Sequence, residues 1–182
     1  MAKLQPHTEK VLGEHLALTF VDKSDYGVFS CLDNDNEVHS VPLALVRLNQ
    51  FIYVQGGQND TKAALYKDGR TVKIVCVAEQ ETPKLKYAEF SAIKNDAKAL
   101  ANQVFAMQYK SAICTTKVLL IENVQEKKLA LQLLSQKYCA KYMSSFDILA
   151  DEYLDKINVY RFEIMDITAK TNKVVQAGWK KV

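Results

Sequence analysis

The apolar residues of this chain recur mainly with the two-residue period of a β-strand, and this pattern is what most limits its fold. In the segment 71–78, the residues Val72, Ile74 and Cys76 alternate with Thr71 and Lys73, so one face of a strand is apolar. Five other segments are strand-like and are bounded by turn residues: 26–32, 37–48, 51–55, 109–122 and 158–168. The sequence therefore predicts an α+β fold on six mostly antiparallel strands, and a sheet of that size usually closes on itself to protect its edges.

Helical periodicity is confined to segments before and between these strands. The sequence predicts an N-terminal helix over 7–24, a short helix over 60–67, one inserted helix over about 86–106 and a helix over 125–139. Residues from about 170 to 182 form a C-terminal tail in this interpretation. Because no repeat or linker divides the chain, residues 1–182 are expected to form a single domain.

Composition excludes several classes of protein. The 182 residues are 48% hydrophobic, which is typical of a globular domain, and 24 Lys plus Arg face 21 Asp plus Glu, which leaves no basic stripe for nucleic acid or an anionic membrane. No apolar run approaches the roughly 20 residues that a membrane-spanning helix needs. The first ten residues lack the apolar core of a signal peptide, so we expect a cytoplasmic protein.

Cysteine and histidine give no sign of a metal site or a nucleophilic site. The four cysteines, at 31, 76, 114 and 139, contain no CxxC pair, so we predict four free thiols. The three histidines, at 7, 15 and 39, are not spaced as metal ligands. Ser40 next to His39 lacks the strand-to-helix turn of a hydrolase nucleophile, so a catalytic triad is not supported and no catalytic residue is identified.

Three stretches in this order resemble the FMN-binding, pyridoxamine 5′-phosphate oxidase-like split barrels, and within them the nitroimidazole-resistance branch. The resemblance extends over roughly 26–169 and implies that the six-stranded sheet is a split β-barrel with peripheral helices. The first stretch combines Tyr26–Leu32 with Val38–Pro42, the second is Phe51–Lys62, and the third combines Tyr109–Lys117, Ile121–Lys128 and Leu133–Tyr138.

The second stretch implies a site for the phosphate of FMN. Gly56 and Gly57 would allow close approach of the backbone, Thr61 offers a hydroxyl and Lys62 a positive charge, with Gln55 at the end of the strand. Asp60 is awkward for an anion site unless its carboxylate caps the following helix. The alternative is an ordinary glycine-rich turn with a solvated lysine.

The other implied flavin contacts lie on two strands. Tyr109 and Ser111 alternate on one strand and therefore share a face, which in the family looks toward the flavin; alternatively, Tyr109 is a core residue and Ser111 a small strand residue. Pro42, Leu43 and Ala44 would lie under the isoalloxazine ring, or else form a barrel strand with an edge proline. The sequence departs from the family pattern at four positions, Gln55, Gly56, Asp60 and Thr116.

The resemblance implies a homodimeric FMN flavoprotein with two pockets at the subunit interface. It would act as an oxidoreductase or reductase on an unidentified small molecule, with a nicotinamide as one candidate electron donor. Two alternatives remain open. One is a non-catalytic protein that binds or senses flavin or haem, and the other is a scaffold that has lost its ligand.

Overall fold

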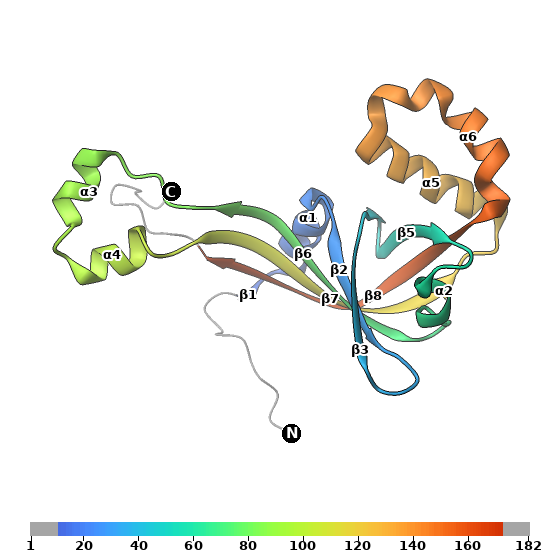
Figure 1. The fold of residues 1–182 in the computed structure, drawn as a ribbon, viewed down its shortest axis with the longest axis horizontal. Helices are drawn as coiled ribbons and strands as arrows, with labels where there is room; N and C mark the ends of the chain where they lie inside the picture. Colours follow the sequence, from blue (N-terminus) through green and yellow to red (C-terminus); the bar gives the residue numbers. More distant parts are fainter. Residues whose placement is uncertain (1–10, 173–182) are drawn as a thin grey trace.

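The fold is built around a strongly curved antiparallel sheet, seen in a computed structural model that describes residues 11–172 (Figure 1). Hydrogen bonds order the strands β3-β2-β6-β7-β8-β5-β4, and β1 pairs with β8 beside this path. The strands are β1 (Val11–Leu12), β2 (Gly27–Leu32), β3 (Val38–Leu43), β4 (Val46–Leu48), β5 (Phe51–Gly57), β6 (Thr71–Glu81), β7 (Gln108–Leu120) and β8 (Ile157–Asn172).

The α+β class is confirmed, but the predicted count of six strands is wrong. The segment expected as one strand over 37–48 breaks at Ala44 and Leu45 into β3 and β4, which gives seven strands in the sheet path. The break occurs because Leu45 is fully buried and its N–H donates to the Tyr138 hydroxyl (3.0 Å) instead of to a neighbouring strand. β3 and β4 are consecutive in the chain but lie at opposite ends of the hydrogen-bonded order, so the expected closure of the sheet is also wrong.

Within the described residues, six helices and two 3-10 turns surround the sheet. The predicted helix over 125–139 is confirmed as α5. The N-terminal helix begins later than expected, because Val11 and Leu12 are paired as β1; positions 7–10 lie outside the described residues. The bounds are α1 (Glu14–Lys23), α2 (Thr61–Leu65), α3 (Tyr87–Ile93), α4 (Ala97–Gln103), α5 (Val124–Cys139), η2 (Ala140–Ser145), α6 (Phe146–Tyr153) and η3 (Leu154–Lys156).

Two apolar clusters lie on opposite sides of β5. The larger cluster fills the concave side of the sheet, where the rings of Phe29 and Phe162 meet edge to face at 5.0 Å and α1 contributes Phe20. The smaller cluster lies under α5 and α6 and includes Tyr53 and Phe146. β5 is therefore buried on both faces, which explains its nearly continuous apolar sequence.

The end of α5 is tied to the sheet by two side chains. The Lys137 ammonium donates to the carbonyls of Ser24 (2.7 Å) and Leu45 (3.0 Å). The Tyr138 hydroxyl lies 2.7 Å from the carbonyl of Asp25 and also receives the Leu45 N–H. Partial burial lowers the pKa of Lys137. These contacts hold the β3–β4 break and the end of α1 against α5.

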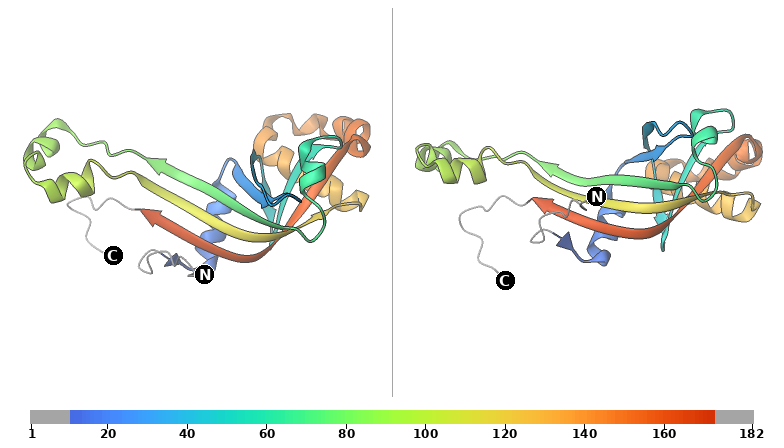
Figure 2. Two further views of the ribbon diagram at one scale, coloured as in Figure 1. Left: turned by 60° about the horizontal axis from the view of Figure 1, so that its bottom comes forward. Right: turned by 90° about the horizontal axis from the view of Figure 1, so that it is seen from below.

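The connection between β6 and β7 projects from the body as an arm, which we define as residues 82–107. The two strands remain paired to Glu81 and Gln108, beyond which α3 and α4 form a small lobe at one end of the molecule (Figures 1 and 2). The single helix expected over about 86–106 is thus wrong, because α3 ends at Ile93 and Asp96 caps a second helix. Within residues 11–172 no helix is long and apolar enough to cross a membrane.

Candidate functional site

Helices α5 and α6 cover the convex face of the sheet only near β4, β5 and the start of β8, and the part that they leave open carries a continuous row of side chains across five strands. The cross-strand register aligns Pro42 on β3, Val28 on β2, Val75 on β6, Ile113 on β7 and Thr168 on β8. Their chain neighbours point to the opposite face and line the main core, including Phe29, Ile74 and Cys114. Side-chain alternation therefore leaves this row on the convex side.

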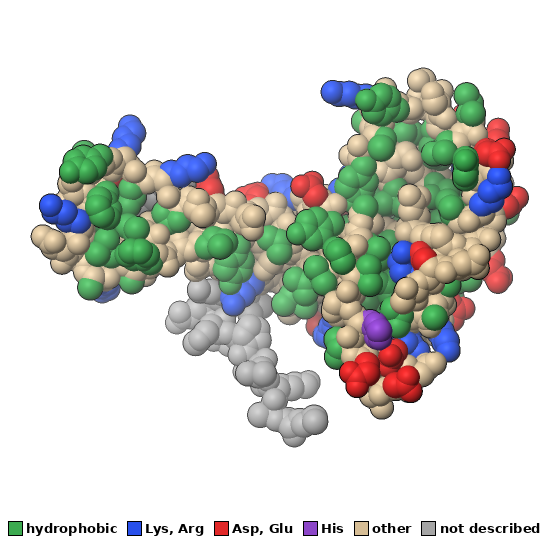
Figure 3. Space-filling view, in the orientation of Figure 1, with side chains coloured by type: hydrophobic (Ala, Val, Ile, Leu, Met, Phe, Trp, Pro, Cys, Tyr) green, Lys and Arg blue, Asp and Glu red, His purple; other side chains and the backbone are tan. Residues whose placement is uncertain are grey.

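We call the convex surface formed by Pro42, Val28, Val75, Ile113, Val77 and Ser111 the outer sheet face. Its valines and isoleucine are unusually exposed for strand residues, at 37% for Val75, 48% for Val77 and 41% for Ile113. Hydrophobic side chains gather over the middle of the molecule in Figure 3, where β2 and β6 lie in Figure 1. A contiguous exposed apolar surface of this kind is typical of a binding or subunit interface.

Four of the residues predicted to contact a flavin lie on or beside this face. Pro42 lies on it. It belongs to the edge strand β3, where the missing N–H of proline removes no hydrogen bond to a neighbouring strand. Ser111 pairs with Val77 and is 9% exposed, and Tyr109 lies two positions earlier on β7. Ala44 is exposed in the β3–β4 connection, whereas Leu43 packs against the main core, so only its backbone could contact a ligand.

The other predicted residues come together at the end of β5 and the start of α2. Asp60 is the N-cap of α2: its Oδ1 accepts the N–H groups of Lys62 (2.9 Å) and Ala63 (3.3 Å). Its Oδ2 lies 2.5 Å from the Lys62 ammonium. Partial burial disfavours ionisation of Asp60, but these hydrogen bonds and the charge of Lys62 outweigh that effect and lower its pKa.

This turn already holds an anion, namely the carboxylate of Asp60. A Cβ built on Gly56 would lie 2.4 Å from Cε of Lys62, so the lysine chain fills the space that the missing side chain leaves. A Cβ on Gly57 would meet nothing closer than 3.9 Å, so this side of the turn stays open, next to the exposed Gln55 and Thr61. A phosphate dianion does not fit these donors unless it displaces Asp60 from Lys62.

Within one chain, Tyr109 and Ser111 lie far along the strands from Gln55–Lys62. Ser111 pairs with Lys170 of β8, whereas Gln55 pairs with Val159 of the same strand. Val159 and Lys170 are eleven positions apart on β8, which corresponds to about 35 Å along the strand. Tyr109 and Ser111 therefore cannot contact the same small ligand as Gln55–Lys62 in one copy of the chain.

The described part of the chain contains no cluster of three or more His, Cys, Asp or Glu side chains able to hold a metal ion. His39 is engaged by the Asp33 carboxylate at 2.9 Å in the β2–β3 hairpin, and His15 is exposed on α1. Three of the cysteines are buried in the main core, and Cys139 is exposed at the end of α5.

The sequence did not predict that the residues of the outer sheet face form one surface. Val28, Val75, Val77 and Ile113 come from three strands, and only the cross-strand register shows that they are neighbours. One signal was present in the sequence: Val75 and Val77 are apolar at positions where the alternation of β6 calls for polar residues.

No family model matches the sequence, and no curated protein matches it significantly in sequence. Structure comparison nevertheless identifies the fold, which is that of the pyridoxamine 5′-phosphate oxidase-like split barrels. The resemblance seen in the sequence is thus confirmed at the level of the fold.

Three solved structures illustrate this similarity. A candidate 5-nitroimidazole antibiotic resistance protein of Bacteroides thetaiotaomicron is 20% identical over 88% of this chain and 86% of its own, with a TM-score of 0.65. An FAD- and haem-binding protein of Mycobacterium smegmatis matches 93% of this chain and 74% of its own at 11% identity and a TM-score of 0.65. A candidate pyridoxamine 5′-phosphate oxidase of Corynebacterium glutamicum matches 94% of this chain and all of its own at 12% identity and a TM-score of 0.53.

Proposed function

We propose that this protein is a flavin-binding split-barrel protein that uses FMN, and that it acts as an oxidoreductase on a small molecule. The observation that carries the proposal is the uncovered outer sheet face, where the apolar row from Pro42 through Val75 to Ile113 lies beside the pair of Val77 and Ser111. A planar apolar ring system fits such a surface, and the small side chains of Pro42 and Ser111 leave room for it. The fold, shared with proteins that bind FAD, supports the same conclusion.

The proposal requires a homodimer. Tyr109 and Ser111 lie about 35 Å along β8 from Gln55–Lys62, so both groups can meet one flavin only if each comes from a different copy of the chain. A two-fold axis through the outer sheet faces would place the Ser111 end of one chain near the Lys62 end of the other, at two equivalent sites. The exposed valines and isoleucine of this face would then be buried between the copies.

The proposal includes a cytoplasmic location and a nicotinamide as electron donor. The four free thiols support a reducing compartment. A simple test of the enzyme hypothesis is the absorption spectrum of the purified protein: a flavin spectrum that is bleached by NADH or NADPH supports it. A flavin spectrum that no nicotinamide changes argues against this donor.

A non-catalytic flavin-binding or flavin-sensing protein is the second candidate function. None of the six residues of the outer sheet face has a side chain that titrates near neutral pH, so that face offers no obvious proton donor. Haem is the less favoured ligand, although one structural neighbour binds it. His39 is held by Asp33, and using it as an axial ligand would break that contact.

The phosphate contact is tested with two variants of the β5–α2 turn. If Lys62 binds the phosphate in competition with Asp60, Lys62→Ala should weaken FMN binding about tenfold to a hundredfold, equivalent to roughly 1.5–3 kcal/mol. Asp60→Asn should tighten FMN binding, because it releases the lysine charge while the amide oxygen can still cap α2.

Riboflavin, which lacks the phosphate, is the matched control ligand for both variants, with affinities measured by fluorescence titration. An unchanged FMN affinity in Lys62→Ala, or an equal loss for riboflavin, would show that residues 56–62 are only a turn. FMN binding would then have to rest on other residues.

A further inference from the structure

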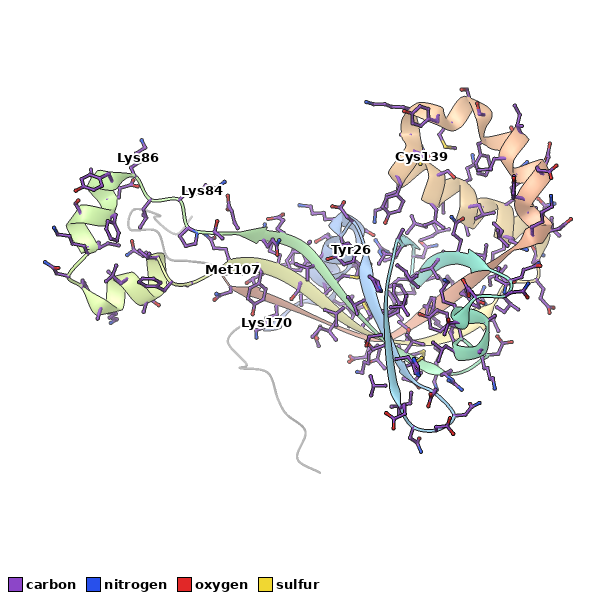
Figure 4. All side chains as sticks on the ribbon, in the orientation of Figure 1. Tyr26, Lys84, Lys86, Met107, Cys139 and Lys170 are labelled. Atoms are coloured by element: carbon purple, nitrogen blue, oxygen red, sulfur yellow. The ribbon has the colours of Figure 1, made fainter. Side chains whose placement is uncertain are left out.

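The arm presents apolar side chains that no other part of residues 11–172 covers. Neither α3 nor α4 contains a buried residue. Tyr87 is 84% exposed and Phe105 is 81% exposed, and Met107 lies at the base of the arm (Figure 4). Large aromatic side chains this exposed on a projecting lobe indicate a surface that is covered in an assembly.

A second uncovered apolar surface lies at the opposite end of the molecule, on α6. Phe146 and Ala150 turn one side of this helix to the smaller core, which leaves Ile148 and Leu149 on the other side, 76% and 54% exposed. Tyr142 of the preceding η2 is 73% exposed. We call Tyr142, Ile148 and Leu149 the α6 surface.

The two surfaces carry opposite charge. The arm contains four lysines, at 84, 86, 94 and 98, against two acids, Glu89 and Asp96. The segment 146–156 contains four acids, at 147, 151, 152 and 155, against one lysine, Lys156. Lys128 and Lys156 pair with Asp147 and Glu152, but those carboxylates remain 80% and 62% exposed. Figure 3 shows lysines around the green side chains of the arm and acidic side chains at the outer edge of the lobe that contains α6.

The topology places these surfaces at the two ends of one long ladder. The arm continues β6 and β7 beyond the pair of Glu81 with Gln108, and α6 and η3 lead directly into the first residue of β8. A two-fold axis perpendicular to the strands, near the middle of this ladder, exchanges its ends. The arm of one chain then extends over the α6 surface of the other.

We propose that the arm of each copy packs on the α6 surface of a second copy, so that the dimer is fastened by two exchanged arms. This inference rests on the dimer of the proposed function and adds the contact that the arm makes in it. The occupant of the α6 surface is a second copy, because the arm offers apolar side chains that can pack on those of this surface and the positive charge that this surface lacks.

The experiment mixes unlabelled and ¹⁵N-labelled full-length protein and joins lysines to carboxylates with a zero-length carbodiimide reagent. We expect crosslinked peptides that connect an arm lysine of one isotope to a carboxylate of segment 146–156 of the other. Light scattering on the same sample should give a dimer.

Two substitutions quantify the contact in sedimentation experiments. Phe105→Ser on the arm and Ile148→Ser on the α6 surface should each raise the dissociation constant of the dimer on the order of tenfold or more. Leu16→Ser is the matched control, because Leu16 is 40% exposed on α1, which packs on the opposite side of the sheet from the outer sheet face, and should leave the constant unchanged.

The outcomes separate this inference from the proposed function. One outcome is a dimer that gives no mixed-isotope crosslinks and keeps its dissociation constant in Phe105→Ser and Ile148→Ser. This result would contradict the arm contact but not the dimer. A monomer overturns both. A dimer with these crosslinks that binds no flavin supports the arm contact and contradicts the proposed function.

Discussion

The body of the protein, which is the curved sheet with the helices packed on it, and the arm both contain large apolar side chains, but these side chains are buried only in the body. In the body, Phe162 is fully buried and makes edge-to-face contacts with Phe29 and Tyr66 at 5.0 and 5.3 Å. In the arm, Phe105 is 81% exposed and the two helices bury no residue. The difference shows that an apolar sequence specifies a compact core only where the topology provides a second surface, which residues 11–172 do not provide for the arm.

The largest expected effect comes from truncating one aromatic side chain in each region. Phe162→Ala should lower the free energy of unfolding by about 3–5 kcal/mol, because it removes a buried ring and leaves a cavity between Phe29 and Tyr66. Phe105→Ala should change the stability of the isolated subunit by less than about 0.5 kcal/mol.

Urea denaturation at several protein concentrations measures both variants and separates subunit stability from any contribution of the dimer. Similar losses for the two variants at every concentration would contradict the comparison. The arm would then be part of the cooperative unit of the body.

A smaller effect is expected from removing one helix cap in each region. Asn123 caps α5 by accepting the N–H of Glu126 (2.9 Å), and Asp96 caps α4 by accepting that of Lys98 (2.9 Å). Asn123→Ala should cost about 1 kcal/mol of global stability. Asp96→Ala should leave global unfolding unchanged but speed hydrogen exchange at Lys98 and Ala99, because α4 can open locally. A global loss in Asp96→Ala as large as that in Asn123→Ala would contradict the separation of arm and body.

Most strands of the body could be predicted from the sequence because they bury one face. Val72, Ile74 and Cys76 are all fully buried, and their alternation is visible without any knowledge of the fold. The strand predicted over 158–168 is confirmed as β8, but the prediction ended too early. β8 continues to Asn172, and its last residues pair with β7. The break at Ala44 and Leu45 was not predicted, because it depends on a contact with Tyr138, 93 residues away.

The helix α6 had no prediction at all. Its exposed residues Ile148 and Leu149 are as apolar as its buried residues Phe146 and Ala150, so the apolar positions alone do not mark its buried face. For the candidate site, the turn at 56–62 could be predicted because it is local in sequence, including the cap at Asp60. The pairing of Lys62 with Asp60 and the outer sheet face depend on side-chain geometry and strand register, which composition and spacing do not contain.

The smallest effect concerns thiol reactivity. Here the comparison is between the three buried cysteines of the core and the one exposed cysteine at the end of α5. Burial raises the pKa of Cys76 and of Cys114 to about 12, and burial also raises the pKa of Cys31. Cys139 is exposed at the end of α5 (Figure 4). An aromatic disulfide reagent at pH 8 should therefore modify one thiol per native chain quickly and all four after unfolding, because only a thiolate in contact with solvent reacts. In Cys139→Ser the fast reaction should disappear, and a remaining fast thiol would contradict the burial of the other three.

The same raised pKa values give a pH dependence of stability whose sign can be worked out. Between about pH 9 and pH 12, the thiols of Cys76 and Cys114 stay protonated in the folded chain but ionise in the unfolded chain. The folded state then binds more protons, so the stability that these thiols contribute is fully present below pH 9 and is lost as the pH rises toward 12. Urea midpoints between pH 8 and 10.5 should fall, and they should fall less steeply in the Cys76→Ala/Cys114→Ala double variant. Equal slopes in the two proteins would mean that other groups cause the alkaline loss.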